Sequence, residues 1–349
     1  MPSVSILMPV YNGERFLREA IDSVLRQTCR DFELLILNDG STDASRTIVN
    51  SYTDSRIRLI DNEQNRGLPA TLNRGLAEAS SGLIARQDAD DLSFPTRLAK
   101  QVEFLSHHPD VALVGTQARF IDERGYSNGS ILRRACSHDS IKWDLLFDNS
   151  FTHSSVMFRK EVIQGEFGGY DETFSRCEDY DLWSRVAMRH RVANLRETLV
   201  SYRLHPYARM SDRMNHLILR DNRRVVESNL CATFGHDFVS ADDVDAVIGV
   251  RLMCQAPYVE QALAVIGRAI EHRKAATPVS SHGDSDFLET VACRYVHVAN
   301  KARSVSIGCS WRVLAQVWRD YPVAWVSVNW AQDAAWVILS EIPRRFGIV

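Results

Sequence analysis

The sequence predicts an α/β fold, with a doubly wound, mostly parallel sheet flanked by helices and a helical C-terminal region after it. Two observations predict this class. Up to residue 121, short runs rich in Val, Ile and Leu alternate with segments whose apolar residues recur at helical spacing. Beyond residue 212, helical patterns follow one another without strand-like runs. Because parallel strands need crossover connections, the alternation indicates a mostly parallel sheet.

Each element of the first part has its own local signal. The apolar run at 32–37 is nearly continuous, which is typical of a strand buried on both faces. The segment 14–26 places its apolar residues on one helix face, and Pro95 suits the first turn of a helix at 94–105. Further strands are predicted at 4–10, 57–60, 83–87, 111–115 and 118–121. Further helices are predicted from the capping turn 38–43 to about residue 52, and at 68–79.

The pattern is mixed between residues 122 and 205 and helical beyond 212. Helices are predicted at 139–147 and 180–190, and strands at 155–158, 192–195 and 199–202. The later helices are predicted at 220–234, 242–254, 259–273, 287–302 and 311–318, with a linker at 275–286. We therefore expect two domains, residues 1–210 and residues 211–349.

Composition narrows the class of protein. The chain has 349 residues, of which 45% are hydrophobic and 24% charged, as in ordinary globular proteins. A net charge of -3 argues against a nucleic-acid partner. The seven cysteines are scattered without a C-x-x-C pair, which indicates reduced thiols in a cytoplasmic protein. We identify no signal peptide and no apolar run of the length of a transmembrane helix.

An acidic run, Asp88, Asp90 and Asp91, follows the strand predicted at 83–87. Carboxylates this close raise each other's pKa unless a cation or hydrogen-bond donors compensate. Mg²⁺ or Mn²⁺ is an economical compensation, because these ions take hard oxygen ligands and share them with substrate phosphates. The alternative is a solvated acidic loop or a helix cap, since Asp suits both.

Three unusual segments follow three of the predicted strands. They are residues 9–13 (Pro-Val-Tyr-Asn-Gly), residues 38–43 (Asn-Asp-Gly-Ser-Thr-Asp) and the acidic run. In an open α/β sheet, ligands bind beyond the carboxyl ends of the strands. The topology brings all three segments to one edge, so we expect them to form a shared site.

These segments, with residues 65–68 (Asn-Arg-Gly-Leu) and 177–183 (Cys-Glu-Asp-Tyr-Asp-Leu-Trp), resemble the motifs of family 2 glycosyltransferases with the GT-A fold. The resemblance spans residues 3–205 in the expected order. It implies inverting transfer of a sugar from a UDP-, GDP- or dTDP-linked donor to a saccharide or lipid-linked glycan acceptor. Surface polysaccharide or glycan biosynthesis is the implied setting. No motif is identified after residue 212.

The resemblance also assigns roles at the donor site. Asp39 contacts the base or ribose, Asp88 the ribose and Asp90 the metal, Mg²⁺ or Mn²⁺, which neutralises the leaving diphosphate. Asp91 supports the loop or the donor sugar. His205 is assigned to the metal or diphosphate, with a structural role as its alternative. The nucleotide-binding set is Pro9, Val10, Tyr11, Asn12, Glu14, Asp39, Arg66, Gly67, Arg86 and Asp88.

On the acceptor side, the resemblance makes Asp179 the general base, with Glu178 positioning the acceptor. The alternative is that both carboxylates only cap the helix behind them. His153 lines the acceptor cleft or is a core residue whose polar atoms have partners. Trp183 stacks on a sugar or packs in the core.

The C-terminal segment carries Trp311, Trp318, Trp325, Trp330 and Trp336 among several arginines. Three interpretations stay open: packing on the rest of the chain, a homo-oligomer interface, or contact with the inner face of a membrane. The acidic residues Asp320, Asp333 and Glu341 weaken the membrane interpretation.

Two other functions compete with the transferase. A sugar nucleotidyltransferase also uses a doubly wound sheet and paired aspartates, but it needs a Gly-rich, lysine-bearing loop after the first strand. This chain has Tyr-Asn-Gly-Glu at residues 11–14 instead. A non-catalytic nucleotide-sugar-binding protein is the other alternative, and the intact carboxylates Asp88, Asp90 and Asp179 argue against it.

Overall fold

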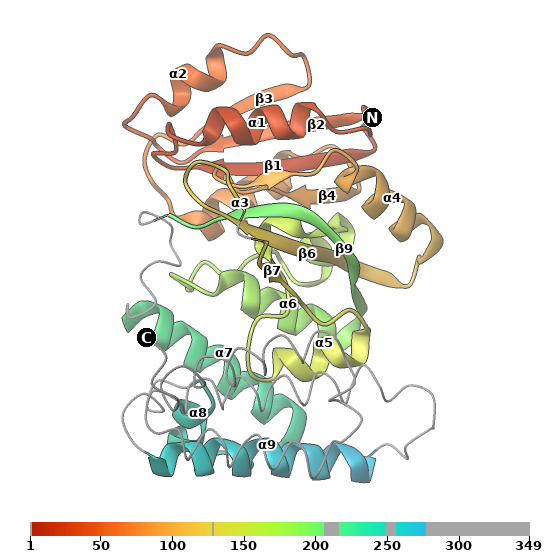
Figure 1. Ribbon diagram of the computed structural model, residues 1–349, viewed down its shortest axis with the longest axis vertical. Helices are drawn as coiled ribbons and strands as arrows, with labels where there is room; N and C mark the ends of the chain where they lie inside the picture. The colour runs from red at the N-terminus through yellow and green to blue at the C-terminus, as the bar shows by residue number, and fades with distance from the viewer. Residues whose placement is uncertain (1, 128, 206–215, 249–255, 277–349) are drawn as a thin grey trace, which may run out of the picture. The chain divides into compact units, whose positions relative to one another are not determined.

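The computed structural model describes residues 2–127, 129–205, 216–248 and 256–276 (Figure 1). The described residues fall into two compact units. The first consists of residues up to Ile141 together with Asn149–Asp221, and the second of Lys142–Asp148 with the described residues from Asn222 on. The predicted helices at 287–302 and 311–318 and the Trp-rich segment lie outside the described residues.

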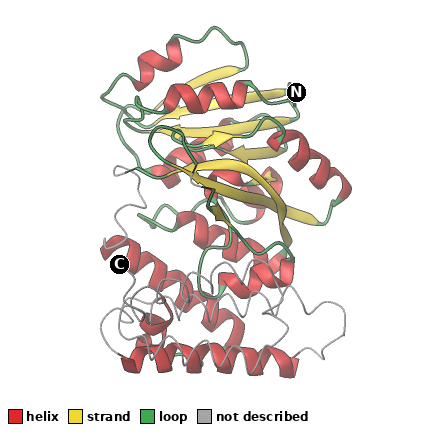
Figure 2. Cartoon of the chain, in the orientation of Figure 1, coloured by secondary structure: helices red, strands yellow, loops and turns green. Residues whose placement is uncertain are grey.

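A nine-stranded sheet is the centre of the first unit (Figure 2). Its main path runs β3-β2-β1-β4-β8-β6-β9-β5, and β7 pairs with β6. Strands β1 to β4, β6 and β9 run parallel, whereas β5, β7 and β8 are antiparallel to their neighbours. The strands are β1 (Val4–Val10), β2 (Phe32–Asn38), β3 (Ile57–Asp61), β4 (Leu83–Arg86), β5 (Leu92–Ser93), β6 (Val111–Ile121), β7 (Ile131–Leu132), β8 (Met157–Arg159) and β9 (Arg191–Arg203). The predicted doubly wound, mostly parallel sheet is confirmed.

Helices cover both faces of the sheet because successive side chains of a strand point to opposite faces. Ile6 and Met8 of β1 share a core with Leu17 and Ile21 of the first helix. The intervening Leu7 faces Gly75 of the third helix, where an added Cβ would lie 3.2 Å from its side chain. The helical elements with residues in this unit are α1 (Leu17–Leu25), α2 (Ser45–Asn50), α3 (Leu68–Glu78), α4 (Arg97–His107), α5 (His138–Leu145), η1 (His153–Ser155), η2 (Glu161–Glu166), α6 (Glu178–Arg189) and α7 (His216–Phe234).

Two pairs of predicted strands are single long strands. β6 joins the predicted strands 111–115 and 118–121, and β9 joins 192–195 and 199–202. Their register shifts at Thr116 and Gln117, which are buried polar residues. The Gln117 side-chain amide donates to the backbone oxygens of Arg134 and Leu195. Because this polar group has partners inside the sheet, the strand continues past the irregularity. The short strands β5 and β7 and the π-helical η2 were not predicted.

The register of the parallel strands aligns their carboxyl ends. Val10 lies opposite Asn38, and Asn38 lies opposite Asp61. Leu7 of β1 is paired with Arg86 at the end of β4. The segments that follow β1, β2, β3 and β4 therefore emerge at one edge of the sheet.

The second unit is helical in the residues that are described. It holds the remainder of α7 with α8 (Ala241–Ile248) and α9 (Ala256–Ala276), close to the predicted 220–234, 242–254 and 259–273. The rings of Phe234, Phe238 and His272 form an aromatic cluster here. No helix among the described residues is both long and apolar enough to cross a membrane.

Candidate active site

A pocket of about 760 Å³ lies at the shared edge of the strands, within the usual size range of small-molecule sites. Many of the residues predicted from the sequence line this pocket. They are Pro9, Val10, Tyr11, Asn12, Asp39, Arg66, Gly67, Asp88, Asp90 and His205. The three segments that follow β1, β2 and β4 therefore meet at one pocket.

Asp39 organises the wall formed by the β3–α3 loop. Its nearly buried carboxylate accepts hydrogen bonds from the backbone N–H groups of Arg66 and Gly67, at 2.8 and 3.0 Å, and from the side chain of Asn62. Gly67 then begins α3 with φ of +88°, a conformation that favours glycine. Asp39 therefore shapes the pocket through the backbone as well as lining it.

The loop after β1 is joined to the loop after β2. The Asn12 side-chain oxygen accepts from Thr42 N–H at 2.8 Å, and Asn12 N–H donates to Ser41. Glu14 is placed differently from the residues that line the pocket, because its carboxylate accepts from Ala44 N–H next to α2. Glu14 therefore joins the loop after β1 to the loop after β2 through this hydrogen bond.

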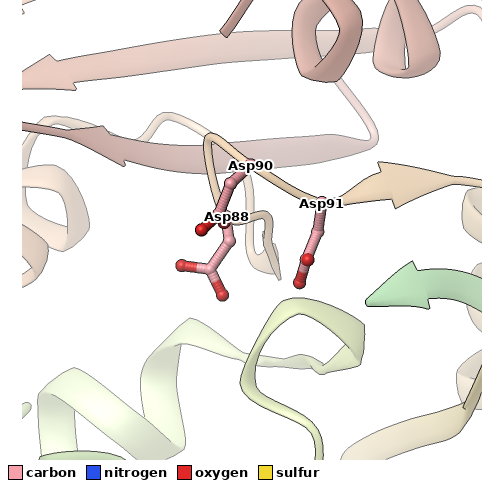
Figure 3. A group of neighbouring side chains, drawn as sticks. All are labelled: Asp88, Asp90 and Asp91. Carbon is pink, nitrogen blue, oxygen red and sulfur yellow. The ribbon is translucent and has the colours of Figure 1, made fainter. Parts of the chain in front are cut away.

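The three acidic side chains leave one short loop between β4 and β5 (Figure 3). One carboxylate oxygen from each lies within 4.8 Å of the others. Only Asp88 and Asp90 line the pocket, whereas Asp91 is buried. Asp90 contacts His205 Nε2 at 3.0 Å, and Asp88 is ion-paired with Arg86. The hard oxygens of Asp88 and Asp90 are suitable ligands for Mg²⁺ or Mn²⁺.

The hydroxyl of Ser154 lies between Asp88 and Asp91 and is within hydrogen-bond distance of both. A hydroxyl has one proton to donate, so one carboxyl group must be protonated for both contacts to be satisfied. Burial, followed by repulsion from Asp90 and Asp88, raises the pKa of Asp91 well above its usual value. Burial opposes ionisation of Asp88 too, but Arg86 and other partners keep the pKa of Asp88 below its usual value. The opposite directions of the two pKa shifts make Asp91 the carboxyl group that holds a proton more readily and Asp88 the one that ionises more readily.

Buried arginines compensate the acidic run from within the protein. Arg86, Arg97 and Arg203 are each about 1% exposed. Arg203 donates to the backbone oxygen of Asp90, and its own N–H donates to Asp91. Burial, and then repulsion from Arg86, lowers the pKa of Arg97 to about 9, which leaves it charged at neutral pH. Cations of the chain itself therefore supply part of the compensation that the sequence led us to expect from a metal.

The predicted base lies at the start of α6. Asp179 accepts a hydrogen bond from Asn149 Nδ2 at 2.8 Å, and His153 Nδ1 lies 3.9 Å from the same oxygen. Burial raises the pKa of Asp179, although its hydrogen bonds and Arg86 oppose the shift. Cys177, directly before α6, has φ of +59°, which is unusual for a residue other than glycine. A carboxylate with a raised pKa is well suited to accept a proton.

Several predicted site residues do not line the pocket. Arg86 lies behind Asp88, and Trp183 is fully buried among the rings of Phe151, Phe158 and Tyr170. This placement favours the packing interpretation of Trp183. The other predicted site residues that do not line the pocket are Glu14, Asp91, His153, Glu178 and Asp179.

Sequence reasoning missed part of the pocket wall. Arg15 and Phe16 line it from the loop before α1, and Glu172, Phe174, Ser175 and Arg176 line it from the segment before α6. The position of this segment directly before the Glu-Asp pair is the signal that could have identified it. Arg203 was missed because an arginine in a strand pattern is ordinarily solvent-exposed.

Sequence comparison identifies relatives of this chain. The model of the family described as "Glycosyl transferase family 2" matches residues 5–165. The putative glycosyltransferase EpsE of Bacillus subtilis (strain 168) is 39% identical over 208 residues, which cover 58% of this chain and 73% of EpsE. The O-antigen biosynthesis glycosyltransferase WbnJ of Escherichia coli is 35% identical over 213 residues, covering 58% of this chain and 80% of WbnJ.

Solved structures share the fold at low sequence identity. Staphylococcus aureus TarS 1-349 in complex with UDP-GlcNAc has a TM-score of 0.56 and 14% identity, covering 91% of this chain and 89% of that one. The mannosyltransferase PcManGT from Pyrobaculum calidifontis, in complex with GDP-Man and Mn²⁺, has a TM-score of 0.51 and 16% identity, covering 99% and 83%. The predicted GT-A architecture is confirmed. With the sequence relatives, these observations show that the chain belongs to glycosyltransferase family 2.

Proposed function

We propose that this protein is an inverting glycosyltransferase that uses a nucleotide diphosphate-sugar donor. The observation that carries the proposal is that Tyr11, Asp39 and Arg66 line the same pocket as Asp88 and Asp90. The first group suits a nucleoside, and the acidic pair suits a metal-bound diphosphate. The structural neighbours that bind UDP-GlcNAc and GDP-Man support this choice of donor class.

We propose that this transfer takes part in the biosynthesis of a polysaccharide or glycan. Relatives named for O-antigen biosynthesis in Escherichia coli and for amylovoran biosynthesis in Erwinia amylovora support it. The acceptor is then a hydroxyl group of a saccharide or a lipid-linked glycan.

Asp90 and Asp88 would hold Mg²⁺ or Mn²⁺, and such an ion neutralises charge on the leaving diphosphate. Arg86 keeps Asp88 ionised, and Arg203 fixes the loop through the Asp90 carbonyl oxygen. His205, which lies two residues after the end of β9, contacts the Asp90 carboxylate and holds it in place. In this proposal, Arg66 contributes positive charge beside the diphosphate from the α3 side of the pocket.

Asp179 would accept the proton of the acceptor hydroxyl as its oxygen attacks the anomeric carbon of the donor sugar. The bond from that carbon to the diphosphate oxygen breaks, and the nucleoside diphosphate leaves with the bonding electrons. Attack from the face opposite the leaving group inverts the anomeric configuration. The raised pKa of Asp179 makes it a stronger base than an exposed aspartate.

A donor screen followed by product analysis tests the proposal. Thermal-shift measurements with UDP-, GDP- and dTDP-sugars, with and without Mn²⁺, should identify a donor that stabilises the protein. NMR of the product formed from that donor should show inversion at the anomeric carbon. Retained configuration would contradict the mechanism, and stabilisation by none of the nucleotide sugars would contradict the donor class.

A further inference from the structure

The segment 171–177 connects the pocket to the proposed base. Glu172, Phe174, Ser175 and Arg176 line the pocket, and α6 with Asp179 begins directly after Cys177. A shift of this segment would therefore move the pocket wall and the base together. We refer to residues 171–177 as the connecting segment.

The beginning of the connecting segment is fixed to α3. The Asn73 side chain donates to the Tyr170 carbonyl oxygen at 2.9 Å and to the Glu172 carboxylate at 3.0 Å. It also accepts from Tyr170 N–H at 2.8 Å. The first turn of α3 itself lines the pocket, so this contact ties the segment to the donor side.

The end of the connecting segment is fixed by Asp221 of α7. One carboxylate oxygen, Oδ2, accepts from Ser175 N–H at 2.9 Å and from Arg176 N–H at 2.8 Å. The other oxygen, Oδ1, is paired with the Arg220 guanidinium at 2.7 Å. Asp221 is about 1% exposed, so these contacts replace water at a buried carboxylate. The matched family region ends at residue 165, well before Asp221.

The contacts of Asp221 lie one and two residues before the strained turn. Cys177 adopts its φ of +59° between the fixed Ser175–Arg176 backbone and the first turn of α6. A residue other than glycine holds such a conformation only where the surroundings determine it. The Asp221 carboxylate supplies that constraint on the N-terminal side.

We propose that Asp221 is a positioning residue for sugar transfer: it fixes the Ser175–Arg176 backbone, which lines the pocket, and thereby sets the place of Asp179 in the first turn of α6. The proposal rests on the proposed role of Asp179 as the base. It adds Asp221, the last residue of the first unit, to the transfer site, although no sequence motif marked it.

Substitutions at Asp221 separate its geometry from its charge. Asp221→Asn keeps a carbonyl oxygen that can accept both N–H groups but loses the charge. Asp221→Glu keeps the charge but moves the carboxylate by one carbon, and Asp221→Ala removes both. Arg220→Gln is the matched control, because it removes the ion pair and leaves both backbone contacts intact.

We expect kcat to fall about ten- to hundredfold in Asp221→Ala and Asp221→Glu, because small displacements of a reacting group are costly. Asp221→Asn and Arg220→Gln should stay within about threefold of the unsubstituted protein. Donor affinity, measured by calorimetry, should change less than kcat does in Asp221→Ala and Asp221→Glu, because β1, the loops after β1 and β4, and the start of α3 supply most of the pocket wall. Unchanged kcat in Asp221→Ala, or equal loss in Asp221→Asn and Asp221→Ala, would overturn the proposal.

Hydrogen exchange tests the contact apart from the reaction. The amides of Ser175 and Arg176 should exchange faster in Asp221→Ala than in Asp221→Asn. Equal exchange in these two variants would overturn the positioning role. Absence of any transfer by the unsubstituted protein would instead contradict the proposed function, and the exchange result would stand independently. If Asp221→Ala does not fold, Asp221→Glu and Asp221→Asn give the same comparison.

Discussion

The three carboxyl groups of the acidic run have different environments, although they lie within four residues of one another. Asp90 lines the pocket beside His205, Asp88 lines it with Arg86 behind, and Asp91 is buried beneath Ser154. Buried arginines relieve part of the repulsion among these carboxylates, and burial with the remaining repulsion raises the pKa of Asp91. The sequence could show that such relief was needed, but the arginines that supply it come from β4, α4 and β9.

The raised pKa of Asp91 makes one variant informative. Asp91→Asn imitates the protonated carboxyl group, so it should keep or raise the free energy of unfolding. Because the pKa of Asp91 is raised on folding, the unfolded chain releases this proton first, and its contribution to stability falls as pH rises above the usual Asp range. The advantage of Asp91→Asn should therefore grow with pH in that range.

Asp91→Ala is the matched control, since it leaves Arg203 N–H without its acceptor. We expect a loss of about 1–3 kcal/mol in the free energy of unfolding, measured by urea denaturation. Equal losses in the Asn and Ala variants would show that Asp91 is ionised.

The base assignment predicts a pH dependence. Asp179 can accept a proton only when ionised, and burial raises its pKa, so kcat/KM should fall as pH drops through that raised value. Asp179→Asn should lower kcat by at least about a hundredfold while the donor Kd changes little. Full turnover in that variant would rule out the assignment.

Asn149→Ala extends the same test. Asn149 donates to the Asp179 carboxylate, and removing a donor to the charged form raises the pKa further. The acidic limb of kcat/KM should therefore move to higher pH. A limb that stays in place would indicate that another group sets it.

At the scale of elements, the strongly patterned segments were predictable and the irregular ones were not. β1, β2 and β4 have nearly continuous apolar runs, and the edge strand β3 carries Ile57, Leu59 and Ile60, so β1 to β4 lie within one residue of their predicted ends. The two-residue strands β5 and β7 are too short to have a period. β6 was divided in the prediction because the buried polar residues Thr116 and Gln117 interrupt its apolar pattern, and the contacts of Gln117 across the sheet satisfy its amide. β9 was divided because the polar residues at 196–198, of which Arg196 and Glu197 are exposed, interrupt its apolar pattern.

The loop after β2 offers a test of how elements shape the pocket. Gly40 has φ of +71°, and an added Cβ would lie 2.7 Å from the backbone of Asn65. Gly40→Ala should therefore cost about 1–3 kcal/mol in the free energy of unfolding. It should also weaken donor binding, because Arg66 and Gly67 follow directly.

Gly82→Ala is the matched control, because an added Cβ there meets no atom within 4 Å. Thermal unfolding and donor calorimetry should show little change in this variant. If both alanine variants lose stability and affinity equally, the strained turn at Gly40 is not the cause.

At the scale of the whole molecule, the candidate site belongs to the first unit, and its wall comes from segments between Pro9 and His205. The sequence could predict their convergence because the carboxyl ends of parallel strands share an edge. It could not predict the connecting segment or Asp221, since those depend on tertiary contacts without a local pattern. The Trp-rich C-terminal segment lies outside the described residues, and its three interpretations stay predictions.

The central claim is that the pocket binds a nucleotide diphosphate-sugar through a metal held by Asp90. Calorimetric titration of the donor, with and without Mn²⁺, tests it most directly in the unsubstituted protein and in Asp90→Ala. Asp110→Ala, which removes an exposed ion pair with Arg191 outside the pocket, is the control. We predict that Mn²⁺ tightens donor binding at least about tenfold in the unsubstituted protein and the control, but not in Asp90→Ala. Equal donor affinity with and without Mn²⁺ in the unsubstituted protein would contradict the claim.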